Sequence, residues 1–211
     1  MKICKKAGCF GEPIGDYCEK HTKSKSIVKP TKKKESSNPK DAKFKTDVQT
    51  FQNIVRAIGE GNCITCGHVF SPADRDGTCH AGHCIQRGRK WLVMMFINCH
   101  TQCASCNNEQ HNNNSDVVIA HGNFINRKYA KFMRELAKDN KVFEDMTATE
   151  LLQKMSIPVK YIPVGYRRDM KEILTEGKKM LKDGWDKKDI RAELISKQKK
   201  FILEFFEKPL Q

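Results

Sequence analysis

The chain has 211 residues, of which 39 are Lys or Arg and 25 are Asp or Glu, and its formal net charge is +14. This length allows one or two domains, and the positive charge favours a polyanionic partner, because docked Lys and Arg release counterions from phosphates. The longest apolar run, Trp91 to Ile97, is far shorter than the ~20 residues that cross a membrane. Residues 1–30 lack the apolar segment of a secretory signal peptide, so we expect a cytoplasmic protein whose ten cysteines are thiols or metal ligands.

The spacing of cysteines in residues 1–21 predicts a zinc knuckle. Three cysteines and one histidine are separated by short loops rich in Gly and Pro, as a chain that wraps around one ion requires. These ligands are Cys4, Cys9, Cys18 and His21. Free thiols on a flexible terminus are the alternative.

The composition of residues 22–46 predicts a basic flexible linker. Nine lysines stand against three acidic residues between Thr22 and Asp47, together with four serines and two prolines. Such a segment can follow a nucleic-acid backbone, or it can be a solvated tether without contacts.

The next region, residues 47–138, predicts the functional core, and it begins with a helix. Thr46-x-x-Gln49 has the pattern of a capping box, and Gly59 or Gly61 ends the helix. One face of this helix is apolar, and its members are Val48, Phe51, Ile54, Val55 and Ile58.

Two C-x2-C pairs in this region predict one structural zinc site. Each pair can present two thiolates at about 2.3 Å from a shared ion, and four such ligands complete a tetrahedron. The pairs are Cys63 with Cys66 and Cys103 with Cys106. A thioredoxin-like redox motif would need only one pair.

Between the two pairs we expect two strands, Thr78–Ile85 and Trp91–Phe96, joined by a basic turn at 86–90. The turn can be merely solvated, or Arg87, Arg89 and Lys90 can contact DNA. A short helix should begin near Cys103 and continue past His111. A longer one follows from Asn123, with Ile125, Tyr129, Phe132, Met133 and Leu136 at helical spacing.

Residues 139–211 predict a mainly helical region. Thr147-x-x-Glu150 caps one helix, Met170 to Leu181 forms an amphipathic stretch, and Asp186 caps the last helix. The apolar positions of these helices predict a core or a homodimer face. This region carries no motif with an assigned role.

A set of four polar residues indicates a catalytic site. Its members are His83, Asn98, Asn107 and His111. Asn107 and His111 are four residues apart and therefore share one side of a helix. A histidine that deprotonates water beside one divalent metal ion can hydrolyse a phosphodiester. Asn98 would accept a hydrogen bond that fixes the tautomer of His83. We expect His68 and His121 to be ordinary loop residues, His100 to make a structural hydrogen bond, and Cys79, Cys84 and Cys99 to be buried.

The order His83, Asn98, Asn107 inside paired cysteine knuckles resembles the HNH (ββα-metal) nuclease signature. More narrowly, Cys63-Ile-Thr-Cys66-Gly67, Ala81-Gly82-His83 and Asn98-x-His100-x-Gln102-Cys103-x-x-Cys106-Asn107 resemble the NinG (Rap) family of phage recombination nucleases. This resemblance covers roughly residues 47–136.

The resemblance implies a divalent-metal endonuclease that cuts branched DNA, such as Holliday junctions and D-loops. By position, His83 matches the general base, Asn98 the orienting residue and Asn107 a ligand of the catalytic Mg²⁺ or Mn²⁺, with His111 as a further ligand. Many HNH enzymes carry a metal ligand directly before the base, where this chain has Gly82. His80, and less strongly Asp76, is the substitute ligand.

The sequence thus predicts an α+β protein with a zinc-stapled ββα-metal core, an N-terminal zinc knuckle and a helical C-terminal region. Its expected cofactors are two structural Zn²⁺ ions and a catalytic Mg²⁺ or Mn²⁺. The expected partners are branched DNA and a second copy bound through the C-terminal helices, in the host-cell cytoplasm if a phage encodes the chain. The alternatives are an HNH homing or nicking nuclease on linear duplex and a non-catalytic zinc protein that binds nucleic acid.

Overall fold

The structure is a computed structural model that describes residues 13–14, 17–18, 39–71, 79–85, 92–156 and 165–207, with side chains from residue 43 onward. The chain divides into two compact units, Met1–Ala42 and Lys43–Gln211. In the first unit, strands β1 (Pro13–Ile14) and β2 (Tyr17–Cys18) form a small antiparallel sheet. No helix in the described ranges combines the length and the hydropathy that crossing a membrane requires.

Helix α2 spans Pro39–Ala57 and begins well before the predicted start at Asp47. Proline suits the first turn of a helix, because its fixed φ is helical and no N–H is left unpaired. Thr46 lies inside this helix, so the prediction of a capping box there is wrong. The predicted apolar face is confirmed, since four of its side chains are at most 2% exposed: Phe51, Ile54, Val55 and Ile58.

Strands β3 (Cys79–His83) and β4 (Cys99–Cys103) form the antiparallel sheet of the second unit, in which His83 pairs with Cys99. The first predicted strand is confirmed over β3. The second, over Trp91–Phe96, is wrong, because Leu92–Met94 forms a 3-10 turn, η2. Every side chain from Leu92 to Ile97 is at most 5% exposed. A short run that is buried on all sides has no period that distinguishes strand from helix.

Helix α3 (Ala104–His111) follows β4 directly, and it ends at His111 rather than beyond it. Helix α4 (Ser115–Asp139) begins before the predicted Asn123. Its N-cap is Asn114, whose Oδ1 accepts hydrogen bonds from the backbone N–H groups of Asp116 and Val117. This cap satisfies two of the backbone donors that a helix start leaves unpaired.

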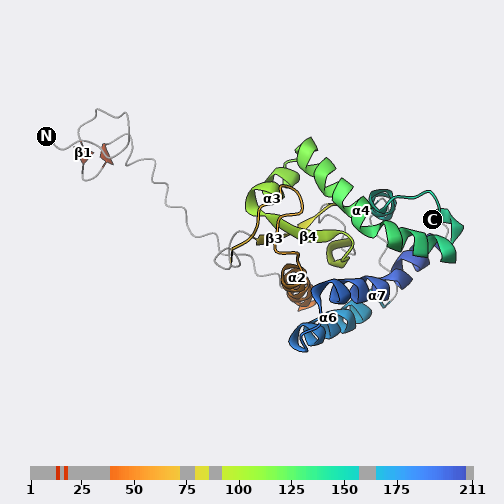
Figure 1. Cartoon of the computed structure of the whole chain (residues 1–211). Coiled ribbons are helices and arrows are strands. Elements are labelled where there is room, and N and C mark those ends of the chain that lie inside the picture. Colours follow the sequence, from red (N-terminus) through yellow and green to blue (C-terminus); the bar gives the residue numbers. More distant parts are fainter. Residues whose placement is uncertain are drawn as a thin grey trace. The chain divides into compact units, whose positions relative to one another are not determined.

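The 3-10 turn η3 (Lys141–Phe143) and the helices α5 (Ala148–Ser156), α6 (Tyr166–Lys182) and α7 (Lys187–Glu207) complete the described chain. Both predicted caps are confirmed: Thr147 bonds with Glu150 at the start of α5, and Asp186 accepts from Lys188 N at 2.8 Å at the start of α7. Helices α6 and α7 lie side by side (Figure 1). Their apolar faces join one core with α2 and the segment 92–97, while a homodimer through these helices stays a prediction.

Two buried polar side chains of α7 bind the backbone of residues 94–99. The Arg191 guanidinium donates to the backbone oxygens of Phe96 and Cys99 at 3.1 and 3.2 Å. The Gln198 amide accepts from Phe96 N at 2.8 Å and donates to Met94 O at 2.7 Å. A segment whose regular structure is limited to a short 3-10 turn leaves backbone groups unpaired, and α7 satisfies several of them.

Candidate active site and metal centre

The four cysteines of the two C-x2-C pairs come together, although they are far apart in the sequence. Their sulfurs all lie within 4.8 Å of one another, and the group could hold a metal ion such as zinc. Four ligands at about 2.3 Å from one ion are separated by about 3.8 Å at the edges of a tetrahedron. The Cys66 and Cys103 sulfurs lie 3.8 Å apart, so the donor set fits zinc.

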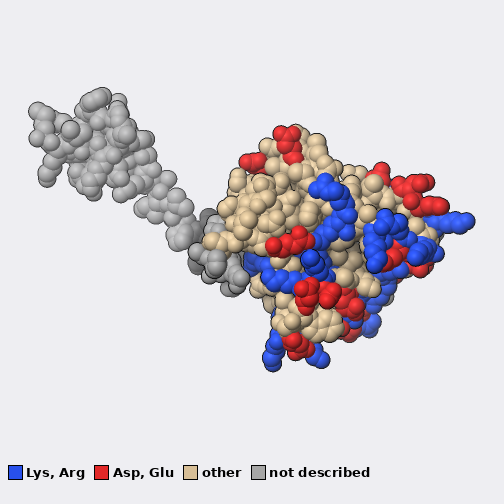
Figure 2. Space-filling view, in the orientation of Figure 1, with Lys and Arg blue, Asp and Glu red and all other residues tan. Residues whose placement is uncertain are grey.

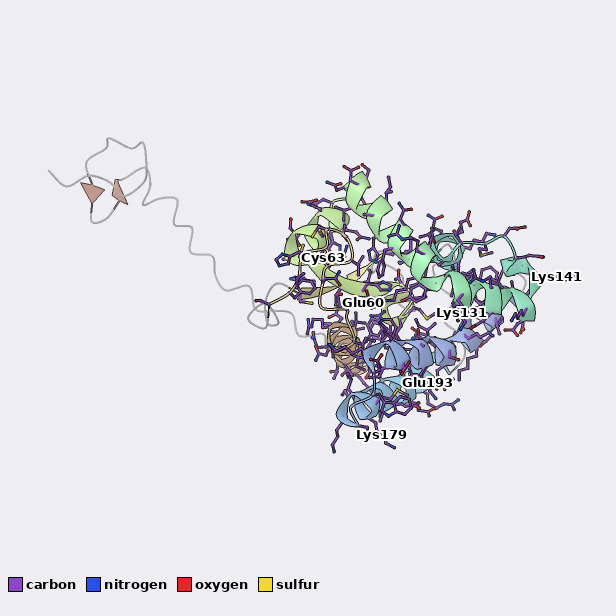
Figure 3. All side chains as sticks on the ribbon, in the orientation of Figure 1. Glu60, Cys63, Lys131, Lys141, Lys179 and Glu193 are labelled. Carbon is purple, nitrogen blue, oxygen red and sulfur yellow. The ribbon has the colours of Figure 1, made fainter. Side chains whose placement is uncertain are left out.

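Backbone hydrogen bonds shape both cysteine loops. Gly67 N donates to Cys63 O at 2.9 Å, and Gly67 has a φ of +77°, a conformation that favours glycine. Cys103 is the N-cap of α3, and its sulfur accepts from Cys106 N at 3.4 Å. The metal group therefore joins the first loop, labelled at Cys63 in Figure 3, to the start of α3.

Proton affinities differ within this group. Burial raises the pKa of Cys63, but backbone amides of Cys66, Cys103 and Thr65 donate to its sulfur and lower the pKa overall to about 7. Burial and the neighbouring thiols raise the pKa of Cys106. Four thiolates at this spacing repel one another, and a divalent cation removes that cost.

His83 lies at the end of β3 and is 4% exposed. Its Nε2 is 2.9 Å from the backbone oxygen of Val93. A carbonyl oxygen can only accept, so Nε2 carries the hydrogen and Nδ1 is the basic nitrogen of the neutral ring. The carbonyl of Val93 thus sets the tautomer of His83.

Asn98 is fully buried, and its side chain bonds to backbone groups of Ile85 and Leu92 rather than to the predicted partner, His83. Its Oδ1 accepts from Ile85 N at 2.8 Å, and its Nδ2 donates to Ile85 O and Leu92 O at 3.2 and 3.1 Å. The Asn98 side chain therefore joins the end of the β3 region to Leu92, next to Val93. It affects His83 by holding that backbone in place.

The predicted ligands of a catalytic metal come from β3 and α3. Asn107 Nδ2 lies 3.4 Å from His80 Nδ1, while His111 is exposed one turn further along α3. Within the described ranges, the four cysteines are the sole group of three or more His, Cys, Asp or Glu residues with closely spaced ligand atoms. The structure thus brings His80 and Asn107 together.

Gly82, which precedes the candidate base, makes room for a neighbouring side chain. A Cβ atom at this position would fall 1.7 Å from Gln102 Oε1. Gln102 is fully buried and donates to Thr65 Oγ1 and to Gln110 Oε1, both at 2.8 Å. A side chain at position 82 would displace this link between the first cysteine loop and α3.

No pattern in the sequence indicated the network of buried hydrogen bonds that extends from α7 to His83. Arg191 donates to Tyr129 Oη, which lies 2.6 Å from His100 Nε2. His100 Nδ1 lies 3.4 Å from His121 Nε2, and His121 Nδ1 lies 2.8 Å from Gln110 Oε1. Gln110 Nε2 then donates to His83 O at 2.9 Å.

The donors and acceptors in this network of hydrogen bonds can be assigned. Gln110 Oε1 can only accept, so His121 carries its hydrogen on Nδ1 and accepts on Nε2 from His100. Burial lowers the pKa of His121 to about 3 and that of His100 well below its usual value. Both rings are therefore neutral near pH 7. The structural bond expected of His100 is confirmed, whereas the prediction that His121 is a loop residue is wrong, because it lies fully buried on α4.

Three predicted groups lie outside the part of the chain whose side chains are described. They are the N-terminal ligands Cys4, Cys9, Cys18 and His21, the DNA-binding residues Arg87, Arg89 and Lys90, and the weaker metal ligand Asp76. Among the remaining cysteines, Cys99 is buried as predicted, and Cys79 and Cys84 are half-buried.

The chain was compared with known proteins. No curated protein and no solved structure matches it. The family model of the bacteriophage lambda NinG protein matches residues 16–158, which is more than half of the chain. This range includes the four cysteines, His83 and the whole of α3. The chain belongs to the NinG family of phage proteins.

Proposed function

We propose that this protein is a metal-dependent endonuclease of the HNH class that hydrolyses DNA phosphodiesters in branched recombination intermediates. Membership in the NinG family indicates a recombination-related phage protein. The observation that carries the proposal furthest is the hydrogen bond between His83 Nε2 and Val93 O, because it leaves Nδ1 as the basic nitrogen.

His83 is the general base in this proposal. A neutral imidazole can accept a proton from an attacking water molecule. As Nδ1 takes up this proton, the ring becomes positive, and the Val93 carbonyl oxygen, which already accepts from Nε2, stabilises that charge. The hydroxide equivalent attacks phosphorus while the bond between phosphorus and the 3′ oxygen breaks, and the leaving 3′ oxygen takes up a proton from solvent water. The products then carry a 5′-phosphate and a 3′-hydroxyl.

Two buried side-chain amides hold the backbone around His83 and its Val93 acceptor in place. Asn98 bonds to Leu92 O and so fixes the backbone that carries the Val93 acceptor. Gln110 bonds to the backbone oxygen of His83 itself and to Cys84 O. A base held by its surroundings loses little orientational freedom when the substrate binds, which lowers the barrier to reaction.

The ligands proposed for the catalytic metal are His80, Asn107 and His111. A divalent cation bound there would stabilise the negative charge that develops on the phosphate and on the leaving oxygen. Imidazole nitrogens are better ligands for a first-row transition metal than for Mg²⁺, so we expect Mn²⁺ to support more activity than Mg²⁺.

The four-cysteine group would hold a structural Zn²⁺ ion. In this position the ion would bind the first cysteine loop to the start of α3, the helix that carries Asn107 and Gln110. The spacing of the Cys66 and Cys103 sulfurs supports this assignment. The preference for branched DNA rests on the family resemblance.

The test is a cleavage assay with zinc-loaded protein, offered a four-way junction or a linear duplex of the same sequence, with Mn²⁺ or Mg²⁺. The proposal expects cleavage of the junction, its loss in His83→Ala and its retention in His68→Ala, which alters an exposed histidine that is neither the proposed base nor a proposed metal ligand. DNA binding by His83→Ala should persist.

Three outcomes would contradict parts of the proposal. Equal cutting of both substrates would exclude a preference for branched DNA. Binding without cutting, with either metal, would instead favour a non-catalytic zinc protein. Full activity of His83→Ala would exclude His83 as the base.

A further inference from the structure

A groove that includes a cluster of basic side chains lies between helices α4 and α7, beside the loop that follows α2. Its volume is about 810 Å³. Figure 2 shows Lys and Arg side chains, interspersed with acidic ones, on this face of the molecule. Six cations line the groove: Lys128, Lys131, Lys187, Lys188, Arg191 and Lys199.

Three acidic side chains, Glu60, Glu135 and Asp186, also line the groove, so cations outnumber acids. Glu60 forms an ion pair with Lys128, and Glu135 lies 4.0 Å from Lys131. Figure 3 labels Glu60 and Lys131. Lys199 also pairs with Asp139, outside the groove, and Arg191 is buried against backbone oxygens, so the remaining excess of positive charge lies mainly at Lys187 and Lys188.

Lys187 and Lys188 supply most of this excess. Both are exposed, and neither forms an ion pair with another residue of the described chain. They occupy the first turn of α7, where the positive end of the helix dipole disfavours cations. Residues that oppose local stability are typical of functional sites, so these lysines indicate an anionic ligand.

Trp185 gives a second and independent indication. It directly precedes the groove residues Asp186 and Lys187, and 52% of its surface is exposed. Exposed aromatic rings beside a basic groove are typical of proteins that bind single-stranded nucleic acid, because unpaired bases stack on the ring while phosphates follow the cations. In duplex DNA the base faces are covered by neighbouring base pairs.

We propose that this groove binds a single-stranded segment of nucleic acid, with its phosphates at Lys187 and Lys188 and an unpaired base stacked on Trp185. The inference rests on the proposed function in so far as the protein acts on DNA, but it does not depend on cleavage. The groove would hold an unpaired strand of the substrate through residues that are distinct from His83 and the four cysteines.

The test measures binding of labelled oligo(dT) by the full chain over a range of salt concentrations, without Mg²⁺ or Mn²⁺. The double variant Lys187→Gln/Lys188→Gln is compared with Lys178→Gln/Lys182→Gln, which removes two exposed lysines from α6 that do not line the groove. For single strands the logarithm of affinity falls with salt by about 0.7 per phosphate contact. The groove variant should therefore bind about 25-fold more weakly at 0.1 M salt and almost normally at 1 M.

Tryptophan fluorescence tests the stacking. The chain has two tryptophans, so Trp91→Phe leaves Trp185 as the single reporter. Saturating oligo(dT) should quench its emission, and Trp185→Ala should weaken binding about tenfold. The groove variant should melt at the wild-type temperature or above it, because two cations leave the helix start.

The outcomes separate the two proposals. If the wild-type chain binds no form of DNA, both the groove and the proposed function are wrong. If it binds oligo(dT) but the groove variant matches the α6 control, only the groove is wrong. Unchanged Trp185 emission at saturation would overturn the stacking, and an equal loss of duplex binding in the groove variant would overturn the single-strand assignment.

Discussion

Replacing Asn98 tests how the candidate base is held. Asn98→Ala removes three buried hydrogen bonds and leaves the N–H of Ile85 and the carbonyl of Leu92 without these partners. At roughly 1 kcal/mol or more for each lost bond, and more for a buried group left unpaired, the free energy of unfolding should fall by about 3–5 kcal/mol. Urea unfolding of the zinc-loaded protein measures this loss. Asn108→Ala, which alters an exposed residue of α3, should change stability by less than about 0.5 kcal/mol.

Asn98→Asp refines the same prediction. It keeps the acceptor for Ile85 N but directs a carboxylate oxygen at two carbonyl oxygens, those of Ile85 and Leu92. Burial and these neighbours should raise the pKa of the new carboxyl, so the variant should be least stable at neutral pH and recover partly as the pH falls. A variant within about 1 kcal/mol of wild type at pH 7 would refute the role assigned to Asn98.

Three further predictions concern the metal group, the glycine before the base and the buried histidines. Cys66→Ser should lose zinc and cooperative melting, because structural zinc supplies ~10 kcal/mol or more of folding energy. Cys79→Ser, which alters a cysteine outside the metal group, should keep both. Zinc content and calorimetry measure the two effects, and a zinc-loaded, native melt of Cys66→Ser would exclude a structural role for the metal. Gly82→Ala should destabilise the protein by about 2–3 kcal/mol in urea unfolding, because its Cβ overlaps Gln102, and wild-type stability would contradict the packing described. Because the pKa of His121 is lower in the folded state than in the unfolded chain, its contribution to stability is complete above pH 6.5 and is lost as the pH falls toward about 3, by up to about 1.4 kcal/mol per pH unit. His121→Gln should flatten this dependence, and an unchanged slope would show that His121 does not cause it.

The spacing of residues predicted the four-cysteine group and the faces of the helices. C-x2-C spacing carries its own geometry, and amphipathic periods report burial directly. The cap at Thr147 was predictable because it involves neighbours in the sequence. The starts of α2 and α4 had signals too, Pro39 and Asn114, but the basic composition around Pro39 and the polar run before Asn123 concealed them.

The position of β4 could not be read from the local pattern. Its three central residues are polar, yet they are buried because their side chains bond to distant partners: His100 to Tyr129, Thr101 to Asn62, and Gln102 to Gln110. An isolated strand of this composition resembles a loop. Only the folded chain provides the partners that make its burial favourable.

The same limit applies to the residues that position His83. Gln198 binds Met94 and Phe96, and Arg191 binds Cys99, across more than 90 residues of sequence. No periodicity relates such residues, so the region 139–211 carried no motif. The structure gives its last helix a role: α7 holds the backbone of the segment that leads to Asn98.

Chemical rescue of His83→Ala tests the central claim most directly. Removing the ring leaves a buried space beside Val93 O, and free imidazole can occupy it and accept the proton in place of the side chain. The measurement is single-turnover cleavage of a four-way junction with Mn²⁺, with and without imidazole. We predict that the variant is inactive alone and regains cleavage as imidazole is added, with a rate that rises with the neutral fraction of imidazole. Wild-type cleavage by His83→Ala without imidazole would contradict the account.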